Sequence, residues 1–350
     1  MRRMGQWLLR LGLVLGLCIM ALLAPVAWVE ITCRGEVVAN GYVALLPPDH
    51  RRAEARTLLT YPEWHIVHAY DDYAQVIQSG HPHDFGYLRA IRSYWSSLCA
   101  LSEQAGAHGG VDTATKQLVY VIGTSFTAEL ALKAAYEETL GRLFTLLRGP
   151  QHSPLDDLSA DQAAAYAKFL QQVPWYKWDF DADRTALAAA RSGALRDHER
   201  NLALGAEYAA KSAYAGIIAS AVAATGADEL TLRMIVTGAS TDTLAAMPDV
   251  SVIANRSEGI EIETPRYRAL THLLVQMAGQ GVNAVEIAGN DDILLTVISD
   301  SPTMKNAIFS FPRQGYGDTR HLLLVKVADL MPTLRAIADG PAQLEHVHDY

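Results

Sequence analysis

The stretch YPEWHIVHAYDDYAQVIQSGHPHDFGYLRAIRSYW, residues 61–95, carries the periodicity that decides the fold of the first half of the chain. Apolar side chains recur in it at three- and four-residue spacing: Val67, Tyr70, Ala74 and Ile77. Because an α-helix has about 3.6 residues per turn, this spacing gathers them into one buried stripe. The sequence therefore predicts a helix over residues 62–78.

The same stretch holds a candidate metal site. His65, His68 and Asp72 stand at positions i, i+3 and i+7, which places them on one face of the expected helix. Transition-metal sites use two imidazoles one turn apart with a carboxylate nearby. The following loop carries His81 and His83, which could fold back to complete the coordination shell. The alternative is that these histidines are helix-surface and loop residues, hydrogen-bonded to nearby carboxylates.

Upstream of this stretch, residues 11–29 form an uncharged apolar run. At about 1.5 Å per residue the run measures roughly 28 Å, close to the thickness of a bilayer's hydrocarbon. Arg2, Arg3 and Arg10 precede it, whereas Arg34 follows it beside acidic residues. The positive-inside bias then places the N-terminus in the cytoplasm and the bulk of the chain outside it, in the periplasm if the source is a Gram-negative bacterium.

A cleaved signal peptide is the competing interpretation of this run. Cleavage after Ala27 would put Pro25 at the −3 position, and cleavage after Ala24 would put Leu22 there, although a small residue is preferred. The sequence therefore favours an uncleaved, single-pass anchor. A second span over residues 117–136 is not expected, because charged side chains inside it are costly at bilayer depth.

Cys33 and Cys99 would both lie in an oxidising compartment, where two cysteines can form a disulfide. Such a bond would tie the root of the anchor to the first folded domain. Two separate buried thiols fit the sequence equally well. The third cysteine, Cys18, lies inside the anchor.

Composition excludes some classes of protein. The net charge is −9 and half of the residues are hydrophobic, so the chain is globular and has no basic surface for nucleic acid. We expect four segments: residues 1–29 as cytoplasmic tip and anchor, 30–53 as linker, 54–227 as a helical domain, and 228–350 as an α+β domain with a short tail.

The helical domain contains several charged patterns. Residues 116–147 predict a long helix on which Glu129, Lys133 and Glu137 form a ladder at i, i+4 spacing, expected to be solvated. Residues 159–162 resemble a capping box that would open the next helix. Alanine-rich helices are expected over 186–227, with residues 197–200 as a charged helix face.

An aromatic stretch follows Pro174. Its acidic residues imitate half of a calcium loop, but Arg184 stands where that loop needs glycine and Ala190 where it needs glutamate, which excludes an EF-hand. Its aromatic side chains either pack into the core or form an exposed patch for a partner or a bilayer surface. They are Trp175, Tyr176, Trp178 and Phe180.

In the last third of the chain the apolar period changes from 3.6 to 2. Residues 258–264 alternate strictly, as in a half-buried antiparallel strand. Further strands are expected at 230–236, 250–254, 284–287, 293–298, 307–311 and 321–327, with helices at 267–278 and 330–338. This order predicts an antiparallel sheet with helices on one face, of ferredoxin-like type, and an α+β fold overall. The tail, residues 345–350, could chelate a metal, but we expect it to be frayed.

No catalytic motif accompanies these elements. Gly238 follows a strand as in a dinucleotide-binding loop, but the further glycines of that loop are missing, and there is no nucleophile elbow or P-loop. The sequence therefore favours a non-enzymatic, membrane-anchored extracytoplasmic protein of binding or assembly type, with a protein partner in or at the same membrane. The alternative is a metal-binding protein or metalloenzyme that uses a transition-metal ion at the His/Asp cluster of residues 63–84.

Overall fold

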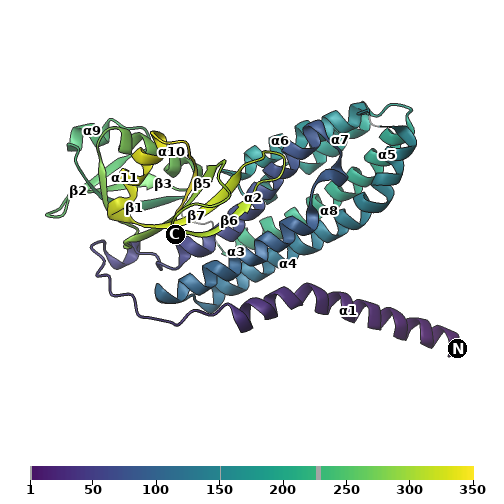
Figure 1. The fold of residues 1–350 in the computed structure, drawn as a ribbon, viewed down its shortest axis with the longest axis horizontal. Helices are drawn as coiled ribbons and strands as arrows, with labels where there is room; N and C mark the ends of the chain where they lie inside the picture. Colours follow the sequence, from purple (N-terminus) through teal and green to yellow (C-terminus); the bar gives the residue numbers. More distant parts are fainter. Residues whose placement is uncertain (1, 150, 226–229) are drawn as a thin grey trace.

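The computed structural model describes residues 2–149, 151–225 and 230–350 and shows helices followed by two antiparallel sheets (Figure 1). The α+β fold class expected from the sequence is confirmed. The expected domain boundary between residues 227 and 228 lies outside the described residues.

The first helix, α1 (Arg2–Thr32), extends away from the sheets along one side of the other helices (Figure 1). Its segment Leu9–Thr32 is long and apolar enough to cross a membrane, and almost none of it is buried in the protein. A second segment, Thr113–Arg148, also passes the test of length and composition, and a larger share of it is buried.

A bundle of helices follows the anchor. Its members are α2 (Arg56–Ser79), α3 (Tyr87–Ala107), α4 (Thr113–Tyr136), a π-helical turn (Glu137–Gly141), α5 (Arg142–Arg148), α6 (Pro154–Leu170), α7 (Phe180–Ala190) and α8 (Leu195–Thr225). Helix α6 begins six residues earlier than expected, because Ser153 caps it and Pro154 occupies its first position. The predicted capping box at residues 159–162 is therefore wrong, and those residues lie inside the helix.

The predicted solvated ladder, which runs from α4 into the π-helical turn, is also wrong. Its three charged residues point into the bundle and pair with charges on α8: Glu129 with Lys211 at 2.8 Å, Lys133 with Glu207 at 2.9 Å, and Glu137 with Arg200 at 2.9 Å. The i, i+4 spacing gives only the face on which they lie. It does not reveal that a neighbouring helix supplies the opposite charges.

Residues 197–200 do not form an exposed charged face either. Asp197, Glu199 and Arg200 are buried and only His198 is exposed. Arg200 donates to both Glu199 and Glu137, so a charged network joins α8 to the π-helical turn. Such a network persists in a low-dielectric interior only because each charge has partners.

The two sheets each contain four strands. The first has β1 (Thr231–Thr237), β2 (Ser251–Asn255), β3 (Ile260–Pro265) and β4 (Asn283–Ile287) in the order β2-β3-β1-β4, with helices α9 (Thr241–Ala245) and α10 (Tyr267–Gly279). The second has β5 (Asp292–Ser299), β6 (Ala307–Pro312), β7 (Thr319–Lys326) and β8 (Gln343–His348) in the order β6-β7-β5-β8, with helix α11 (Val327–Ala338).

The two sheets repeat one topology. In each, the third strand of the unit pairs with the second and the first, the first pairs with the fourth, and all pairs are antiparallel. This is the strand order of a ferredoxin-like unit. The first unit has both helices of that motif, whereas the second has only the later one. Helix α10 packs on β8 and α11 packs on β4, so the two units share one hydrophobic core.

The C-terminal residues are structured, and the expectation of a frayed tail is wrong. Strand β8 pairs along β5, with Leu294 opposite His348. His346, His348 and Tyr350 are buried, and the Tyr350 hydroxyl donates to the carbonyl of Asp292. The sequence did not reveal this short strand, because four of its six residues are polar.

A disulfide joins Cys33, just after α1, to Cys99 on α3, with the two Cα atoms 5.0 Å apart. Replacing Cys99 with serine should lower the melting temperature, because the bond closes a loop over a sequence separation of 66 residues. In the chain-entropy model such a loop is worth about 4 kcal/mol. Thermal unfolding of the detergent-solubilised protein measures the effect, and Cys18→Ser, an exposed free cysteine, is the matched control that should change nothing. Equal melting temperatures for the two variants would show that the bond does not stabilise the fold.

Candidate functional site

Helix α2 lies at the junction of the bundle and the second sheet. Leu58, Tyr61 and Trp64 of α2 pack with Leu294 of β5 and Leu322 of β7 in one hydrophobic cluster. The Trp64 ring stacks on His346 of β8, with ring centroids 3.5 Å apart. Because α2 is amphipathic over this length, its apolar side packs against the sheet, and the histidines of α2 are buried at the same contact.

The structure places His65 and His68 in separate environments. His65 is buried between two hydroxyls: its Nδ1 lies 3.2 Å from the Tyr61 hydroxyl and its Nε2 lies 3.3 Å from Ser93 Oγ. His68 Nε2 lies 3.4 Å from a carboxylate oxygen of Glu345. Burial lowers the pKa of His65 to about 3 and that of His68 well below its usual value, so both imidazoles are neutral.

Asp72 lies one turn further along α2 and joins the bundle to the loop after β6. Its Oδ2 accepts a hydrogen bond of 2.9 Å from the Gln314 backbone N–H. Its Oδ1 lies 3.8 Å from Arg320 and 3.9 Å from Arg313. Burial raises the pKa of Asp72 to about 6, although Arg320 acts in the opposite direction.

His81 and His83 do not fold back to these residues. Their rings stack on each other with centroids 5.3 Å apart, and His81 faces His152 at 5.5 Å. Among the described residues, groups of three or more potential metal ligands in reach of one another are Cys33–Cys99–Glu103 and Glu54–His108–Asp292. Neither group contains the five residues chosen from the sequence. A metal ion at those five stays a prediction, and it would require their side chains to move.

Arg320 of β7 is the centre of the junction, and sequence reasoning missed it. It is 1% exposed, and it donates two hydrogen bonds to the Glu345 carboxylate, at 2.5 and 2.6 Å. This bidentate geometry is among the strongest that two side chains form in proteins. Burial lowers the pKa of Arg320, but Glu345 and Asp72 outweigh burial and raise it. No local signal in the sequence of β7 marks this arginine as buried.

Three buried histidines beside this pair have ring nitrogens without a hydrogen-bond partner among the described residues: His68 Nε2, His346 Nε2 and His348 Nδ1. His346 Nδ1 lies 2.9 Å from Thr271 Oγ1, and His348 Nε2 lies 3.3 Å from Thr296 Oγ1. Burial lowers the pKa of His348 to about 3 and that of His346 well below its usual value. The junction therefore holds several neutral imidazoles in a nearly dry environment.

Glu54, His108 and Asp292 are residues of the types that bind metals, and they lie close together. However, cationic side chains of the protein already pair with their carboxylates. His108 Nδ1 lies 3.4 Å from Asp292 and 3.7 Å from Glu54, and the Glu54 carboxylate raises the pKa of His108. Lys326 Nζ lies 2.7 Å from the same Asp292 carboxylate. The chain's own cations thus neutralise this group, and we interpret it as an ion-pair cluster.

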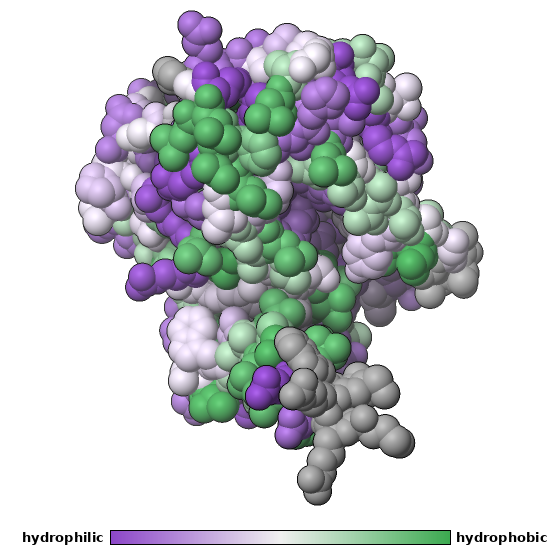
Figure 2. All heavy atoms as spheres, turned by 90° about the vertical axis from the view of Figure 1, so that its right-hand side faces the viewer, coloured by the Kyte–Doolittle hydropathy of each residue, from purple (hydrophilic) through white to green (hydrophobic). Residues whose placement is uncertain are grey.

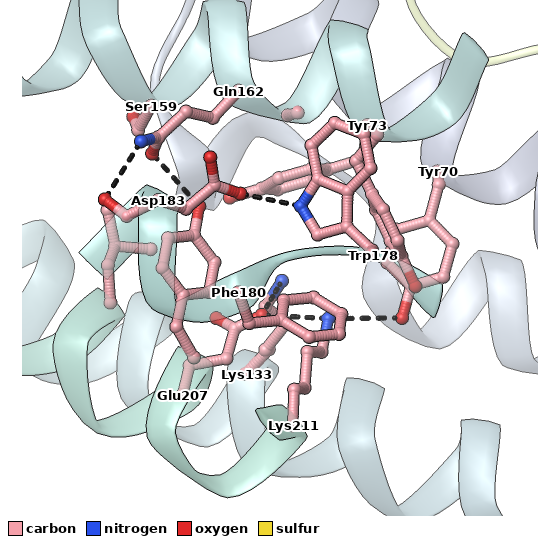
Figure 3. A pocket seen from close by; sticks show the side chains of 14 residues that line it. Tyr70, Tyr73, Lys133, Ser159, Gln162, Trp178, Phe180, Asp183, Glu207 and Lys211 are labelled. Atoms are coloured by element: carbon pink, nitrogen blue, oxygen red, sulfur yellow. Dashed lines mark hydrogen bonds and ion pairs between the residues drawn. The ribbon is translucent and has the colours of Figure 1, made fainter. Parts of the chain in front are cut away.

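A cavity of about 440 Å³, counted with the solvent at its mouth, lies between α2, α6, α7 and α8 (Figure 3). Lys211 reaches into it, 2.8 Å from Glu129 and 3.3 Å from the Tyr70 hydroxyl, and its ammonium lies over the Tyr70 ring. Burial lowers the pKa of Lys211, but Glu129 and the surrounding hydroxyls and carboxylates raise it well above its usual value. Lys211 is therefore charged and fully paired.

The aromatic stretch after α6 packs mainly into this part of the bundle. Phe180 is buried, and Trp178 lines the cavity with its Nε1 donating to Asp183 at 2.7 Å. Trp175 stacks at 5.3 Å against Tyr214 of α8, and Tyr176 is half-buried beside it. The stretch thus closes one side of the bundle, and its exposed area is small.

One pair resembles a nucleophile with its base. Ser93 and His65 are in contact beside a small polar cleft that is also lined by Arg89 and Gln314. However, Ser93 Oγ donates to the Ala90 carbonyl of its own helix, and an imidazole with a pKa near 3 is a weak base at neutral pH. The geometry is better suited to hold α2, α3 and the sheet together than to transfer an acyl group.

No family model, curated protein or solved structure matches this chain.

Proposed function

We propose that this chain is a membrane-anchored extracytoplasmic protein of binding or assembly type, which presents its folded body to a protein partner at a fixed orientation to the membrane. The observation that carries the proposal is the coupling of anchor and body. A flexible linker would leave the orientation of the body to the membrane unfixed. Here, the segment after α1 is attached at several successive points.

The first attachments lie at the end of α1. The Glu30 carboxylate accepts hydrogen bonds from the Tyr120 hydroxyl at 2.6 Å and from Lys116 Nζ at 3.3 Å, both on α4. Three residues further on, Cys33 is bonded to Cys99. The root of the anchor is therefore held by both α3 and α4.

The next attachments are contacts between backbones. The linker crosses the end of α3 at a point where both the linker and the helix have a glycine. A Cβ on Gly106 would lie 2.7 Å from the Glu36 carbonyl oxygen. The Val38 N–H donates to the Gly106 carbonyl at 3.0 Å. A larger residue at Gly106 would push the linker off the helix, so the close approach requires glycine.

The last attachments reach the first sheet. The buried Glu286 carboxylate of β4 accepts hydrogen bonds from the backbone N–H groups of Leu45 and Leu46, at 2.6 and 2.8 Å, and from the Tyr42 hydroxyl at 2.7 Å. Hydrogen bonds to a charged acceptor are worth about 1.5–3 kcal/mol each. The linker therefore connects anchor, bundle and sheet as one body.

Two features support an extracytoplasmic location for this body. Arg2, Arg3 and Arg10 precede the apolar run, which favours a cytoplasmic N-terminus. Disulfides persist in oxidising compartments, and Cys33 and Cys99 follow the run. A reporter fused after Asp49 should then be active as an exported phosphatase and dark as a cytoplasmic fluorophore.

The partner is tested by cross-linking in membranes, followed by purification in detergent. We expect one stoichiometric protein partner for the native chain and a clear loss of it for Gly106→Val combined with Cys33→Ser, which removes two of the attachments between anchor and body. Cys18→Ser should retain the partner. If the native chain recovers no stoichiometric partner, the proposal fails. If the double variant is folded and recovers it equally well, the fixed orientation is unnecessary.

A further inference from the structure

The outward face of α4 and α5 is apolar. Its exposed large side chains follow one another at helical spacing, and Leu132 and Leu146 are 73% and 80% exposed. The other members of this face are Leu118, Val121, Leu143 and Leu147, together with Leu140 in the π-helical turn between the two helices. Figure 2 shows hydrophobic side chains gathered in patches on the end of the bundle that carries α5. A soluble surface of this kind is normally covered by a partner or a membrane.

Three charges of this part of the chain are directed away from this face. Glu129, Lys133 and Glu137 turn inward and are paired with α8. Of the charged residues on the outward side, Glu138 and Arg142 pair with each other at 2.6 Å. Helices in contact with lipid show this arrangement, because a charge in hydrocarbon is costly unless it faces the protein interior and has a partner.

The position of α1 gives the depth of this face. Glu30, near the end of α1, contacts Lys116 and Tyr120 in the first turns of α4. From there α4 and α5 run toward the same side of the molecule as the N-terminus, at an angle that takes them away from α1 (Figure 1). If α1 crosses a membrane over Leu9–Thr32, the exposed leucines of α4 and α5 lead obliquely inward from its outer boundary.

We propose that the outward face of α4 and α5 is immersed in the hydrocarbon of the membrane that α1 enters, and that lipid acyl chains cover it. The opposite side of the bundle stays in water, since α6 carries exposed charges there, among them Asp157 and Lys168 (Figure 1). The bundle then rests obliquely on the membrane. Its internal ion pairs replace the solvation that its charges would have had in water.

Fluorescence quenching by brominated lipid tests the proposal on the full-length chain. Single cysteines at Leu132→Cys and Leu146→Cys are labelled with bimane on a Cys18→Ser background, in which Cys33 and Cys99 remain bonded. Each protein is reconstituted into phosphatidylcholine vesicles with and without acyl-chain bromine. Asp157→Cys and Lys168→Cys are matched controls on the charged side, and Leu13→Cys on α1 is the positive control.

We expect the labels at 132 and 146 to be quenched severalfold more than those at 157 and 168, and to an extent comparable with the label at 13. Quenching at 132 and 146 no stronger than at the charged side would overturn the proposal. So would efficient disulfide cross-linking between two copies of the Leu146→Cys protein in vesicles, because a second copy of the chain would then cover the face.

Discussion

Acidification from pH 7 to about pH 5 should cost this protein several kcal/mol of its free energy of unfolding. The cause is four buried neutral histidines at the junction of α2 and β8: His65, His68, His346 and His348. The ordinary pKa of each is 6.5, and burial lowers the folded-state pKa of His65 and His348 to about 3 and the other two well below 6.5. At a pH between the folded-state pKa and the unfolded-state pKa, these histidines bind protons in the unfolded chain but not in the folded chain.

The sign of the effect follows from this difference. A depressed folded pKa contributes stability that is complete above pH 6.5 and is lost as the pH falls. Each histidine contributes a slope of about 1.4 kcal/mol per pH unit within its window. Asp72 acts oppositely, because its folded pKa is raised from 3.8 to about 6, and it offsets roughly one histidine between these values.

Chemical denaturation at pH 7 and pH 5 measures the slope. The variant His346→Phe keeps a ring against Trp64 and should lower stability at pH 7, because Thr271 loses one of its hydrogen-bond partners. It should also flatten the slope by about 1.4 kcal/mol per pH unit. His198→Gln, an exposed histidine on α8, is the control and should leave the slope unchanged. A native protein that is equally stable at both pH values would show that these imidazoles are not held neutral.

Replacing Arg320 with methionine should have the largest effect of any single charge removal at the junction. The substitution leaves the Glu345 carboxylate without its bidentate partner. It also removes the Arg320 guanidinium from beside the Asp72 carboxylate. Breaking a buried pair by removing one partner costs about 3–5 kcal/mol, because the other charge stays buried.

Urea unfolding of Arg320→Met against the native chain measures this cost. Arg184→Met, which removes an exposed i, i+3 pair with Asp181, is matched in chemistry and should stay within about 0.5 kcal/mol of the native chain. The double variant Arg320→Met, Glu345→Leu should recover part of the loss, since it removes the unpaired charge. Equal effects for Arg320→Met and Arg184→Met would mean that Arg320 does not hold the junction.

The strands and helices of the C-terminal half could be predicted from the sequence because their signals are local. The expected strand at residues 293–298 became β5 (Asp292–Ser299), and the helix at 267–278 became α10 (Tyr267–Gly279). Alternation and apolar spacing suffice for this. Strand β8 was missed because His346 and His348 are polar residues whose burial depends on α2, which lies far away in sequence.

The candidate site was predictable only in part. The sequence drew attention to α2, but it assigned His65, His68 and Asp72 to a shared ligand set, whereas each has a different partner on another element. Those partners, Ser93, Glu345 and Gln314, carry no motif. The repeated sheet topology was likewise invisible, because it is preserved in strand order rather than in residue identity.

The charges of α4 illustrate the same limit. On an isolated helix, the i, i+4 spacing of Glu129, Lys133 and Glu137 predicts a solvated ladder, because opposite charges at this spacing can pair in water. Their buried partners on α8 invert that interpretation and leave the leucines of α4 outward. The direction of a helix face is a property of the packed bundle.

The central claim is that the anchor and the folded body move as one unit, and a distance measurement tests it directly. Spin labels at Val14→Cys on α1 and Leu202→Cys on α8, both exposed, are placed on a Cys18→Ser background and reconstituted in lipid nanodiscs. Pulsed electron paramagnetic resonance should give one narrow distance distribution, which broadens in Gly106→Val combined with Cys33→Ser and Cys99→Ser. A broad distribution in the chain with its native linker and disulfide would show a loosely tethered body and contradict the account.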